Sequence, residues 1–397
     1  MHCLRGADKT GRKVVGITLL KHHYIMKIIG KNQWEILLLL LLAMVQMPAE
    51  AKGSWKEYAA NAQEVRYVGR IDESVQGMVQ YDWVGTYFET EFTGGTFEVK
   101  IADAGTTFYN VFIDGQWVRK FPVGQKDAQW LTLAKGLSKG KHTVRLQRCT
   151  EGEYGTTQIS GFRVAAKGVL TRPADRKRFI EVYGDSYTCG YGTEAAKASD
   201  RFSVDTENCD QAYGCIIARY FDADYALTAH SGQGFVRNWG DAKQVSDENM
   251  SHRVLRVMDK DASKAYAFNR HRPDIVLINL GTNDFSPVAI PTPEQYAGAY
   301  VKLIQTLREH YGEVPVLCIE PHSANAYLHT ALQEVQRRTV GMPKVFFANS
   351  LQNMVTEQYD MGADWHPNYQ GQRKIASCLI PQISAIMSWG LEDKVIK

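Results

Sequence analysis

The sequence predicts two domains, an all-β sandwich followed by an α/β domain that is built on a parallel sheet. The chain has 397 residues, a length that favours two domains over one. Short alternating strands separated by glycine-rich turns fill residues 54–168, and apolar strands alternate with helical segments in residues 177–390. The first pattern is typical of a sandwich or jelly roll. The second is typical of a three-layer α/β/α sandwich.

Residues 1–51 have the pattern of a secretory signal peptide. Met26 and Lys27 precede an apolar block at residues 36–45, and an Ala-x-Ala exit site ends at Ala51. Basic start, apolar core and small-residue exit together predict export, with Met26 as a candidate start. The alternative is an N-terminal membrane anchor, although the block is short for a spanning helix. We therefore expect a secreted or periplasmic protein, with no stable membrane insertion after the signal is removed.

Charge and cysteine spacing exclude several classes of protein. The formal net charge of +3 is small, and no basic run is interleaved with aromatic residues, so nucleic acid is not an expected partner. No Cys-x-x-Cys and no Cys/His cluster with zinc spacing occurs among the seven cysteines. No metal or organic cofactor is implied. Cys209 and Cys215 could form a disulfide in an oxidising compartment.

Alternation and turn residues predict three hairpins in the β-domain. The first joins residues 87–92 to residues 97–101 through a Gly-Gly turn, and the second joins residues 111–113 to residues 116–118 through Asp-Gly. In the third, a turn at residues 138–141 leads into a strand at residues 142–146. We expect the domain core, rather than a sugar-binding surface, to contain the three tryptophans Trp83, Trp117 and Trp130. The domain is interpreted as a scaffold.

The second domain has five expected strands and five expected helices. The strands are residues 179–183, 225–229, 274–280, 314–319 and 344–348. The helices are residues 212–220, 247–259, 293–311, 326–340 and 368–387, and Pro381 is expected to bend or break the last one. Residues 172–177 form a credible linker. This order predicts a doubly wound sheet.

The turn Gly184-Asp185-Ser186 directly follows the first strand of that sheet. Side chains at the carboxyl ends of parallel strands carry the chemistry of open α/β folds. A serine there needs a base, and His366 lies in another loop, just before the final helix. Asp364 can accept from the second ring nitrogen and set the tautomer. Asp360 is a rival for that role.

Two more loops supply candidate donors for a tetrahedral oxyanion. Gly232 follows the second strand and Asn283 follows the third. The backbone N–H groups of Ser186 and Gly232, with the side-chain amide of Asn283, are the three candidates. Trp365 and Tyr187 are candidates for substrate binding, because each lies next to an expected catalytic residue.

These blocks resemble the SGNH (GDSL-type) hydrolases. Gly184-Asp185-Ser186, Gly232, Gly281-Thr282-Asn283-Asp284 and Asp364-Trp365-His366 occur in the order of that superfamily. The preceding β-domain, with Gly69-Arg70-Ile71-Asp72 near its start, looks like carbohydrate esterase family 2. The resemblance implies an SGNH fold, Ser186 as nucleophile, His366 as base, Asp364 as its partner, and Ser186, Gly232 and Asn283 as the oxyanion hole. Some members of that family lack the acid and run on a Ser-His pair alone, but this chain keeps Asp364, which supports a full Ser-His-Asp triad that works through an acetyl-enzyme.

The sequence therefore predicts a secreted serine esterase that removes O-acetyl groups from a plant polysaccharide of the xylan or mannan type. Its expected partner is the acetylated carbohydrate. One alternative is another esterase of the superfamily, such as a lipase, a thioesterase or a sialate O-acetylesterase. A second alternative is a non-catalytic carbohydrate-binding protein that keeps the fold.

Overall fold

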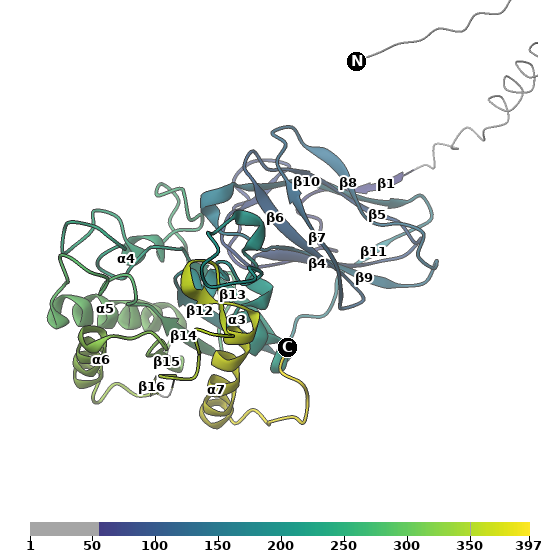
Figure 1. The fold of residues 1–397 in the computed structure, drawn as a ribbon. Coiled ribbons are helices and arrows are strands. Elements are labelled where there is room, and N and C mark those ends of the chain that lie inside the picture. The colour runs from purple at the N-terminus through teal and green to yellow at the C-terminus, as the bar shows by residue number, and fades with distance from the viewer. Residues whose placement is uncertain (1–54, 350) are drawn as a thin grey trace, which may run out of the picture. The chain divides into compact units, whose positions relative to one another are not determined.

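Two antiparallel sheets pack face to face in the first part of the described chain (Figure 1). The computed structural model describes residues 55–349 and 351–397, so the expected signal peptide at 1–51 lies outside the described residues. One sheet has the order β1-β10-β5-β8 with β3 beside β10, and the other has the order β11-β4-β9-β6-β7 with β2 beside β4. The strands are β1 (Trp55–Tyr58), β2 (Arg66–Val68), β3 (Val79–Tyr81), β4 (Tyr87–Phe92), β5 (Phe97–Ala102), β6 (Thr107–Ile113), β7 (Gln116–Val123), β8 (Gln129–Ala134), β9 (His142–Arg148), β10 (Thr157–Ala165) and β11 (Leu170–Thr171).

One of the three expected hairpins forms. β6 and β7 pair across the Asp114-Gly115 turn. The other two predictions are wrong, because β4 and β5, and likewise β8 and β9, belong to different sheets. Strands joined by a turn that crosses between the two sheets alternate apolar and polar residues just as hairpin strands do. The sequence pattern therefore does not distinguish a crossing turn from a hairpin turn. Gly94 and Gly95 make the first crossing at φ of 94° and 72°, angles that glycine adopts at little cost.

The second part of the described chain is built on a five-stranded parallel sheet with the order β13-β12-β14-β15-β16. Its strands are β12 (Arg178–Gly184), β13 (Ala223–Ala229), β14 (Ile275–Asn279), β15 (Val316–Ile319) and β16 (Val345–Ala348). Its helices are α2 (Ser186–Cys189), α3 (Tyr213–Tyr220), α4 (Met250–Arg253), α5 (Pro293–Tyr311), α6 (Ala326–Arg338) and α7 (Tyr369–Met387). Short 3₁₀ turns are η1 (Gly152–Tyr154), η2 (Val204–Thr206), η3 (Cys209–Gln211) and η4 (Ala363–Trp365), and β17 (Met361–Gly362) pairs with β18 (His366–Pro367).

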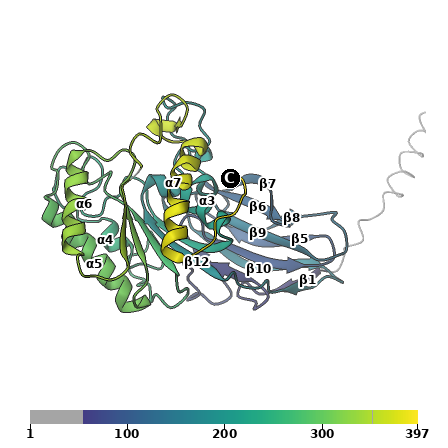
Figure 2. The same ribbon diagram turned by 90° about the horizontal axis from the view of Figure 1, so that it is seen from below.

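Helices cover both faces of this sheet, which gives the predicted three layers (Figures 1 and 2). Helices α3 and α7 share one buried cluster with Ile180, Val182 and Leu277, and α5 and α6 share another with Val276 and Ile278. Neighbouring strand residues point to opposite faces, and both faces are apolar here. The expected fold class is confirmed.

Two helix predictions need correction. The helix expected at residues 247–259 is only the single turn α4. The backbone beyond it is held in other contacts, since the N–H groups of Asp259 and Lys260 donate to the Asp82 carboxylate of the β-domain. Of the bend or break expected at Pro381, the break is absent, because α7 runs through that residue without interruption.

The β-sandwich and the α/β domain share buried contacts within one compact unit, residues 55–397. Val68, Val84, Tyr87 and Cys149 of the sandwich belong to the same apolar cluster as the sheet and α3. The Arg70 guanidinium, also buried, pairs with Glu181 of β12 at 3.3 Å. Separating the two domains would therefore expose apolar surface and a buried charge.

Cys209 and Cys215 are buried free thiols and do not form the disulfide that the sequence left open. Of the three tryptophans expected in the sandwich core, Trp83 is buried, whereas the Trp117 side chain is exposed.

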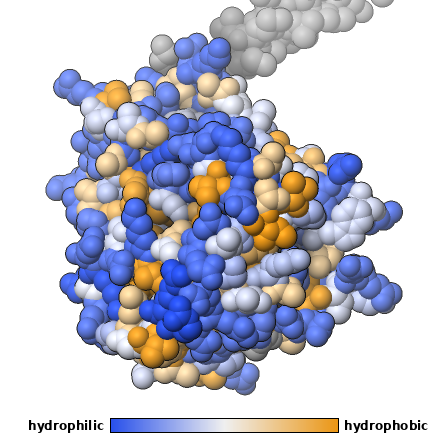
Figure 3. Space-filling model, turned by 90° about the vertical axis from the view of Figure 1, so that its left-hand side faces the viewer, coloured by the Kyte–Doolittle hydropathy of each residue, from blue (hydrophilic) through white to orange (hydrophobic). Residues whose placement is uncertain are grey.

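Within the described residues, no helix is long and apolar enough to cross a bilayer. The face shown in Figure 3 is mostly hydrophilic, and its hydrophobic residues form separate small patches.

Candidate active site

Ser186 lies at the carboxyl end of β12, as the sequence predicts, and is the first residue of the short helix α2. The sheet reverses its strand order here, because β13 pairs with one side of β12 and β14 with the other. Such a switch point opens a crevice for ligands. Asp185 caps α2, accepting from the Tyr187 N–H at 3.1 Å. The turn therefore holds the Ser186 hydroxyl at the sheet edge with 6% of the residue exposed.

His366 meets Ser186 across 180 residues of sequence. The Ser186 hydroxyl donates to His366 Nε2 over 2.9 Å, and His366 Nδ1 donates to the backbone carbonyl of Asp364 over 3.0 Å. This pair of contacts fixes the neutral tautomer in which Nδ1 carries the hydrogen and the lone pair of Nε2 accepts from the serine hydroxyl. Burial lowers the pKa of His366 below its ordinary value, although the carbonyl contacts of its loop oppose the shift. The ring is therefore an unprotonated base at neutral pH.

The carboxylate of Asp364 does not contact His366, which corrects the expected side-chain partnership. Its oxygens accept from the Phe202 N–H at 3.1 Å, from Tyr191 at 3.2 Å and from Arg201 at 3.1 Å. Burial opposes ionisation of this group, but these donors hold its pKa below the ordinary value. The carboxylate is an anchor for the loop, and a backbone carbonyl takes the place expected for it.

The local backbone explains this exchange. Asp364 and Trp365 have φ of 46° and 58°, in the left-handed region that side chains other than glycine rarely adopt. Their N–H groups donate to the carbonyls of Asp200 and Ala198 at 2.9 and 3.1 Å. The turn thus directs the Asp364 carbonyl towards the imidazole and its side chain towards residues 201–202. Strain of this kind persists where surrounding contacts enforce it, often at functional sites.

Tyr191 is a contributor to the site that sequence reasoning missed. Its ring packs on the imidazole of His366, with centroids 4.3 Å apart, and stacks on Phe202 at 3.8 Å. Its position five residues after Ser186, between two glycines, was the available signal. The rival partner Asp360 is bound instead to Lys374 and to Thr356.

Two of the expected oxyanion donors, the backbone N–H groups of Ser186 and Gly232, have no acceptor among the described residues. In the described part of the chain, the amides of Ser186 and Gly232 donate no hydrogen bond, whereas those around them are used. Gly232 has φ of 73°, a conformation that suits glycine. The Asn283 amide donates to the Gln233 carbonyl at 2.9 Å and to Asp185 at 3.4 Å. The three expected oxyanion donors thus lie on loops that follow β12, β13 and β14.

Asp185 and Asp284 tie these loops together, as expected for structural carboxylates. Asp284 accepts from the N–H groups of Phe235, Val236 and Arg237 at 2.6 to 3.0 Å. Burial raises the pKa of Asp185 to about 7 and that of Asp284 to about 6. Neither donates to or accepts from His366, so among the described residues the imidazole contacts a backbone carbonyl and the Ser186 hydroxyl but no carboxylate.

Aromatic side chains surround the pair. Trp365 is 55% exposed, so it offers a free indole face beside His366. Tyr187 is buried, its ring lies edge-on to the imidazole at 5.5 Å, and its hydroxyl donates to Ser323. The ring of His322 stacks on Tyr187, and burial lowers its pKa to about 4. His322 is therefore neutral, and its Nδ1 has no partner among the described residues.

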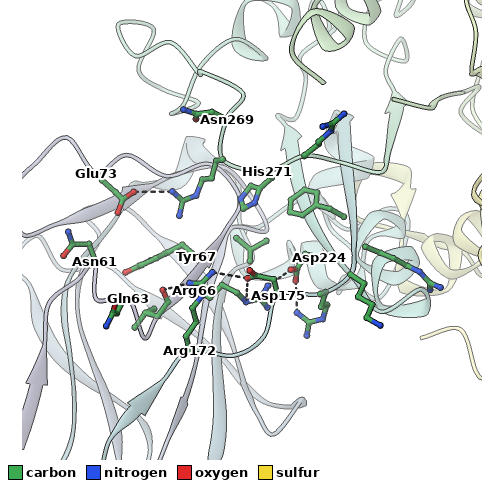
Figure 4. A pocket seen from close by; sticks show the side chains of 18 of the residues that line it. Asn61, Gln63, Arg66, Tyr67, Glu73, Arg172, Asp175, Asp224, Asn269 and His271 are labelled. Carbon is green, nitrogen blue, oxygen red and sulfur yellow. Dashed lines mark hydrogen bonds and ion pairs between the residues drawn. The ribbon is translucent and has the colours of Figure 1, made fainter. Parts of the chain in front are cut away.

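A pocket of about 730 Å³ lies at the opposite, amino-terminal edge of the sheet (Figure 4). It is lined from both domains, with Phe179 and Asp224 at the starts of β12 and β13. Its charges are largely paired: Arg66 contacts Asp224 and Arg270 contacts Glu73. It contains neither Ser186 nor His366, so the chemistry and this cavity lie at different edges of the sheet.

Two family profiles match the chain. The profile described as "Carbohydrate esterase 2 N-terminal" matches residues 67–173, and that of the "GDSL-like Lipase/Acylhydrolase family" matches residues 182–374. The cellulase/esterase CelE of Acetivibrio thermocellus is 28% identical over 333 residues, which is 82% of this chain. The chain spans only 40% of the length of CelE.

Other relatives match over nearly their whole length. An acetylxylan esterase/glucomannan deacetylase of Cellvibrio japonicus is 29% identical over 76% of this chain and 84% of its own length. A family two carbohydrate esterase from Clostridium thermocellum, solved in complex with cellohexaose, superimposes with a TM-score of 0.76 at 29% identity, covering 82% of this chain and 100% of that chain. With the Ser186–His366 pair at the switch point of an SGNH sheet, the chain combines an N-terminal domain that matches the carbohydrate esterase 2 profile with a GDSL-type hydrolase domain, and it is similar to the family two carbohydrate esterases.

Proposed function

We propose that this protein is a secreted serine esterase that removes O-acetyl groups from a plant polysaccharide of the xylan or mannan type. The observation that carries the proposal is the 2.9 Å contact between Ser186 Oγ and His366 Nε2, beside two unused backbone N–H groups. The substrate class is supported by relatives named as acetylxylan esterase and glucomannan deacetylase. Export is supported by the pattern of residues 1–51.

In the first half of the reaction, Ser186 Oγ attacks the acetyl carbonyl carbon while His366 Nε2 takes the hydroxyl proton. The negative charge that develops on the carbonyl oxygen is stabilised by the N–H groups of Ser186 and Gly232 and by the Asn283 amide. His366 then gives its proton to the sugar oxygen, which leaves as an alcohol. The products are a free sugar hydroxyl and an acetyl-serine.

In the second half, water attacks the acetyl-serine, and His366 again takes and returns one proton. Acetate leaves and Ser186 is regenerated. The imidazolium that forms transiently keeps its Nδ1–H on the Asp364 carbonyl, a neutral acceptor that orients the ring. We propose that Ser186 and His366 act as a catalytic pair, with the Asp364 carboxylate serving to hold the loop.

Two exposed indoles support a carbohydrate substrate. Trp365 precedes His366, and Trp239 is bound through its backbone N–H to the Gly232 carbonyl at 2.9 Å. Both are more than half exposed. A flat apolar ring with a polar edge binds the face of a sugar at little entropic cost. We place the sugar that carries the acetyl group against these two side chains.

Replacing the nucleophile tests the assignment. We expect the wild-type protein to release acetate from acetylated xylan and from 4-nitrophenyl acetate, and Ser186→Ala to lose kcat by a factor on the order of 10⁶. Ser377→Ala, a substitution on the exposed face of α7, is the matched control and should leave the rate unchanged. Acetate release by Ser186→Ala at a near-normal rate would refute the proposal.

A series of 4-nitrophenyl esters with increasing acyl chain length distinguishes an O-acetylesterase from a lipase or thioesterase. We expect the rate to fall steeply from the acetate to the butyrate ester of 4-nitrophenol. Equal or higher rates on octanoate, or on acyl-thioesters, would favour the other esterase classes of the superfamily. Mass spectrometry of acetylated xylo- and mannooligosaccharides, before and after treatment, then identifies the sugar and the hydroxyl.

A further inference from the structure

Glu151 is a β-domain residue whose side chain reaches into the catalytic edge of the α/β domain. It lies between β9 and the turn η1, and only 1% of its surface is exposed. Its carboxylate oxygen Oε2 accepts from the backbone N–H of Ser231 at 2.6 Å. The same oxygen accepts from the thiol of Cys189 at 3.6 Å. One buried carboxylate therefore contacts two elements of the catalytic edge.

Those two elements carry the two backbone oxyanion donors. Ser231 directly precedes Gly232, and Cys189 is the last residue of α2, the helix that begins with Ser186. The N–H of Ser231 is turned inward onto Glu151, and Gly232 then adopts its left-handed conformation with an unused N–H. At 2.6 Å, the hydrogen bond from the Ser231 N–H to the Glu151 carboxylate is short. It holds the orientation of the peptide that leads into Gly232.

From these contacts, we infer that Glu151 is a positioning residue for the oxyanion hole, through which the β-sandwich sets the geometry of the catalytic loop. The inference deepens the proposed function and rests on it, since it concerns the same hole. Glu151 does not touch the substrate. It acts through the Ser231–Gly232 peptide.

The backbone of Glu151 is itself rigidly held. Its carbonyl accepts from the guanidinium of Arg148 at 2.9 Å, and its N–H donates to Glu207 at 2.8 Å. Arg148 is fully buried and also binds Asp103 and Thr157 within the sandwich. The Glu151 carboxylate thus projects from a fixed backbone. A residue that positions a catalytic group needs such a rigid support.

The residue before Ser231 is also tied to the sandwich, through one intermediate residue. His230, which precedes Ser231, donates from Nδ1 to Asp259 at 2.6 Å. The N–H of Asp259 in turn donates to Asp82, a buried residue of the β-domain, at 2.7 Å. Two β-domain carboxylates therefore hold the segment that carries Gly232, one directly and one through Asp259.

The spacing of Glu151, Cys189 and Glu207 also resembles that of a metal site, since one ligand atom of each lies within 4.8 Å of the others. The contacts favour a hydrogen-bonded cluster. Glu151 Oε2 already accepts from an N–H and a thiol. Burial raises the pKa of Glu207 well above its ordinary value, which disfavours the deprotonated carboxylate that a metal ion would need as a ligand.

Three substitutions test the role of this carboxylate. Glu151→Ala removes the acceptor, Glu151→Asp keeps the charge but draws it back by one methylene, and Glu151→Gln keeps an oxygen at the same reach. Glu98→Gln is the matched control, since Glu98 is a buried carboxylate of the sandwich that binds Arg163 and Thr132 and contacts no catalytic loop. The readouts are kcat and KM on 4-nitrophenyl acetate, the rate at which a fluorophosphonate labels Ser186, and the melting temperature.

We expect Glu151→Ala and Glu151→Asp to lower kcat by about 10- to 100-fold with KM nearly unchanged. The labelling rate of Ser186 should fall in parallel, and Glu151→Gln should recover most of both. Glu98→Gln should change neither rate. If Glu151→Ala does not fold, the contrast between the Asp and Gln variants carries the test.

Two results would overturn the inference. The first is a lowered melting temperature with unchanged kcat and labelling rate per folded molecule, which would make Glu151 purely structural. The second is loss of wild-type activity in EDTA with recovery on adding Zn²⁺, which would make the cluster a metal site. Fluorophosphonate labelling requires no acetyl ester, so failure of the proposed substrate class would not be confused with failure of this inference.

Discussion

The two loops that complete the site are held by different parts of the molecule. The loop of His366 is held within the α/β domain, where residues 198–202 bind the N–H groups and the carboxylate of Asp364. The loop of Gly232 is held from the β-sandwich, by Glu151 directly and by Asp82 through Asp259. The proposed base is therefore held by a local turn, and the proposed oxyanion loop is held by contacts from a second domain.

The comparison of the two loops also shows that separation along the chain does not predict which side chains contact each other. Asp364 is two residues from His366, yet its carboxylate points away from the imidazole. Glu151 is 80 positions from Ser231, yet its carboxylate binds that residue's N–H. The left-handed backbone at Asp364 turns its carboxylate away from His366. Packing between the two domains places the Glu151 carboxylate next to Ser231.

The largest effect is expected on the oxyanion side. Asn283→Ala should lower kcat by roughly 10² to 10³ with a smaller change in KM, because it removes one donor and the tie to the Gln233 carbonyl. Steady-state kinetics on 4-nitrophenyl acetate measure this. Asn325→Ala is the control: that residue caps α6 and should cost stability and leave kcat intact. Equal rates for Asn283→Ala and wild type would remove Asn283 from the hole.

A smaller effect is expected on the base side. Asp364→Asn should lower kcat by no more than about tenfold, because the backbone carbonyl that holds His366 is retained. Loss of the acid of a Ser-His-Asp triad costs about 10⁴. A loss of that size would mean that the carboxylate turns onto the imidazole during turnover, and it would restore the triad that the sequence suggested.

The smallest effect is expected in the pH profile. His366 must be unprotonated to act, and burial lowers its pKa. The acid limb of kcat/KM should therefore lie below pH 6.5, the ordinary pKa of histidine. The Asp364 charge raises the pKa of His366, so Asp364→Asn should move the limb to lower pH still. Profiles of both proteins between pH 4 and 8 test the sign, and a limb above pH 6.5 would contradict it.

Much of the site could be predicted because its parts follow strands. Ser186, Gly232 and Asn283 each come shortly after an apolar parallel strand, and such strands end at one edge of the sheet. The helix at residues 293–311 was predicted at its observed limits, because Pro293 marks its start. Local periodicity and capping carry that information.

Three features could not be predicted from local patterns. The turns after β4 and β8 cross between sheets, although they alternate like hairpins. The helix expected at residues 247–259 is replaced by contacts of Asp259 and Lys260 with Asp82. Tyr191 is marked only by its place between two glycines and Glu151 by no local pattern, so their contacts with His366 and Ser231 emerge from packing.

By itself, the amino-acid sequence determined the class of fold and the order of the loops that follow its strands, and it identified Ser186 and His366 as candidates, since these depend on apolar periodicity and on turns within a few residues. The tertiary structure decided which atom orients the histidine and which domain holds the oxyanion loop. Those outcomes depend on backbone direction at Asp364 and on the reach of Glu151 across a buried interface. Both are set by contacts between segments far apart in the chain.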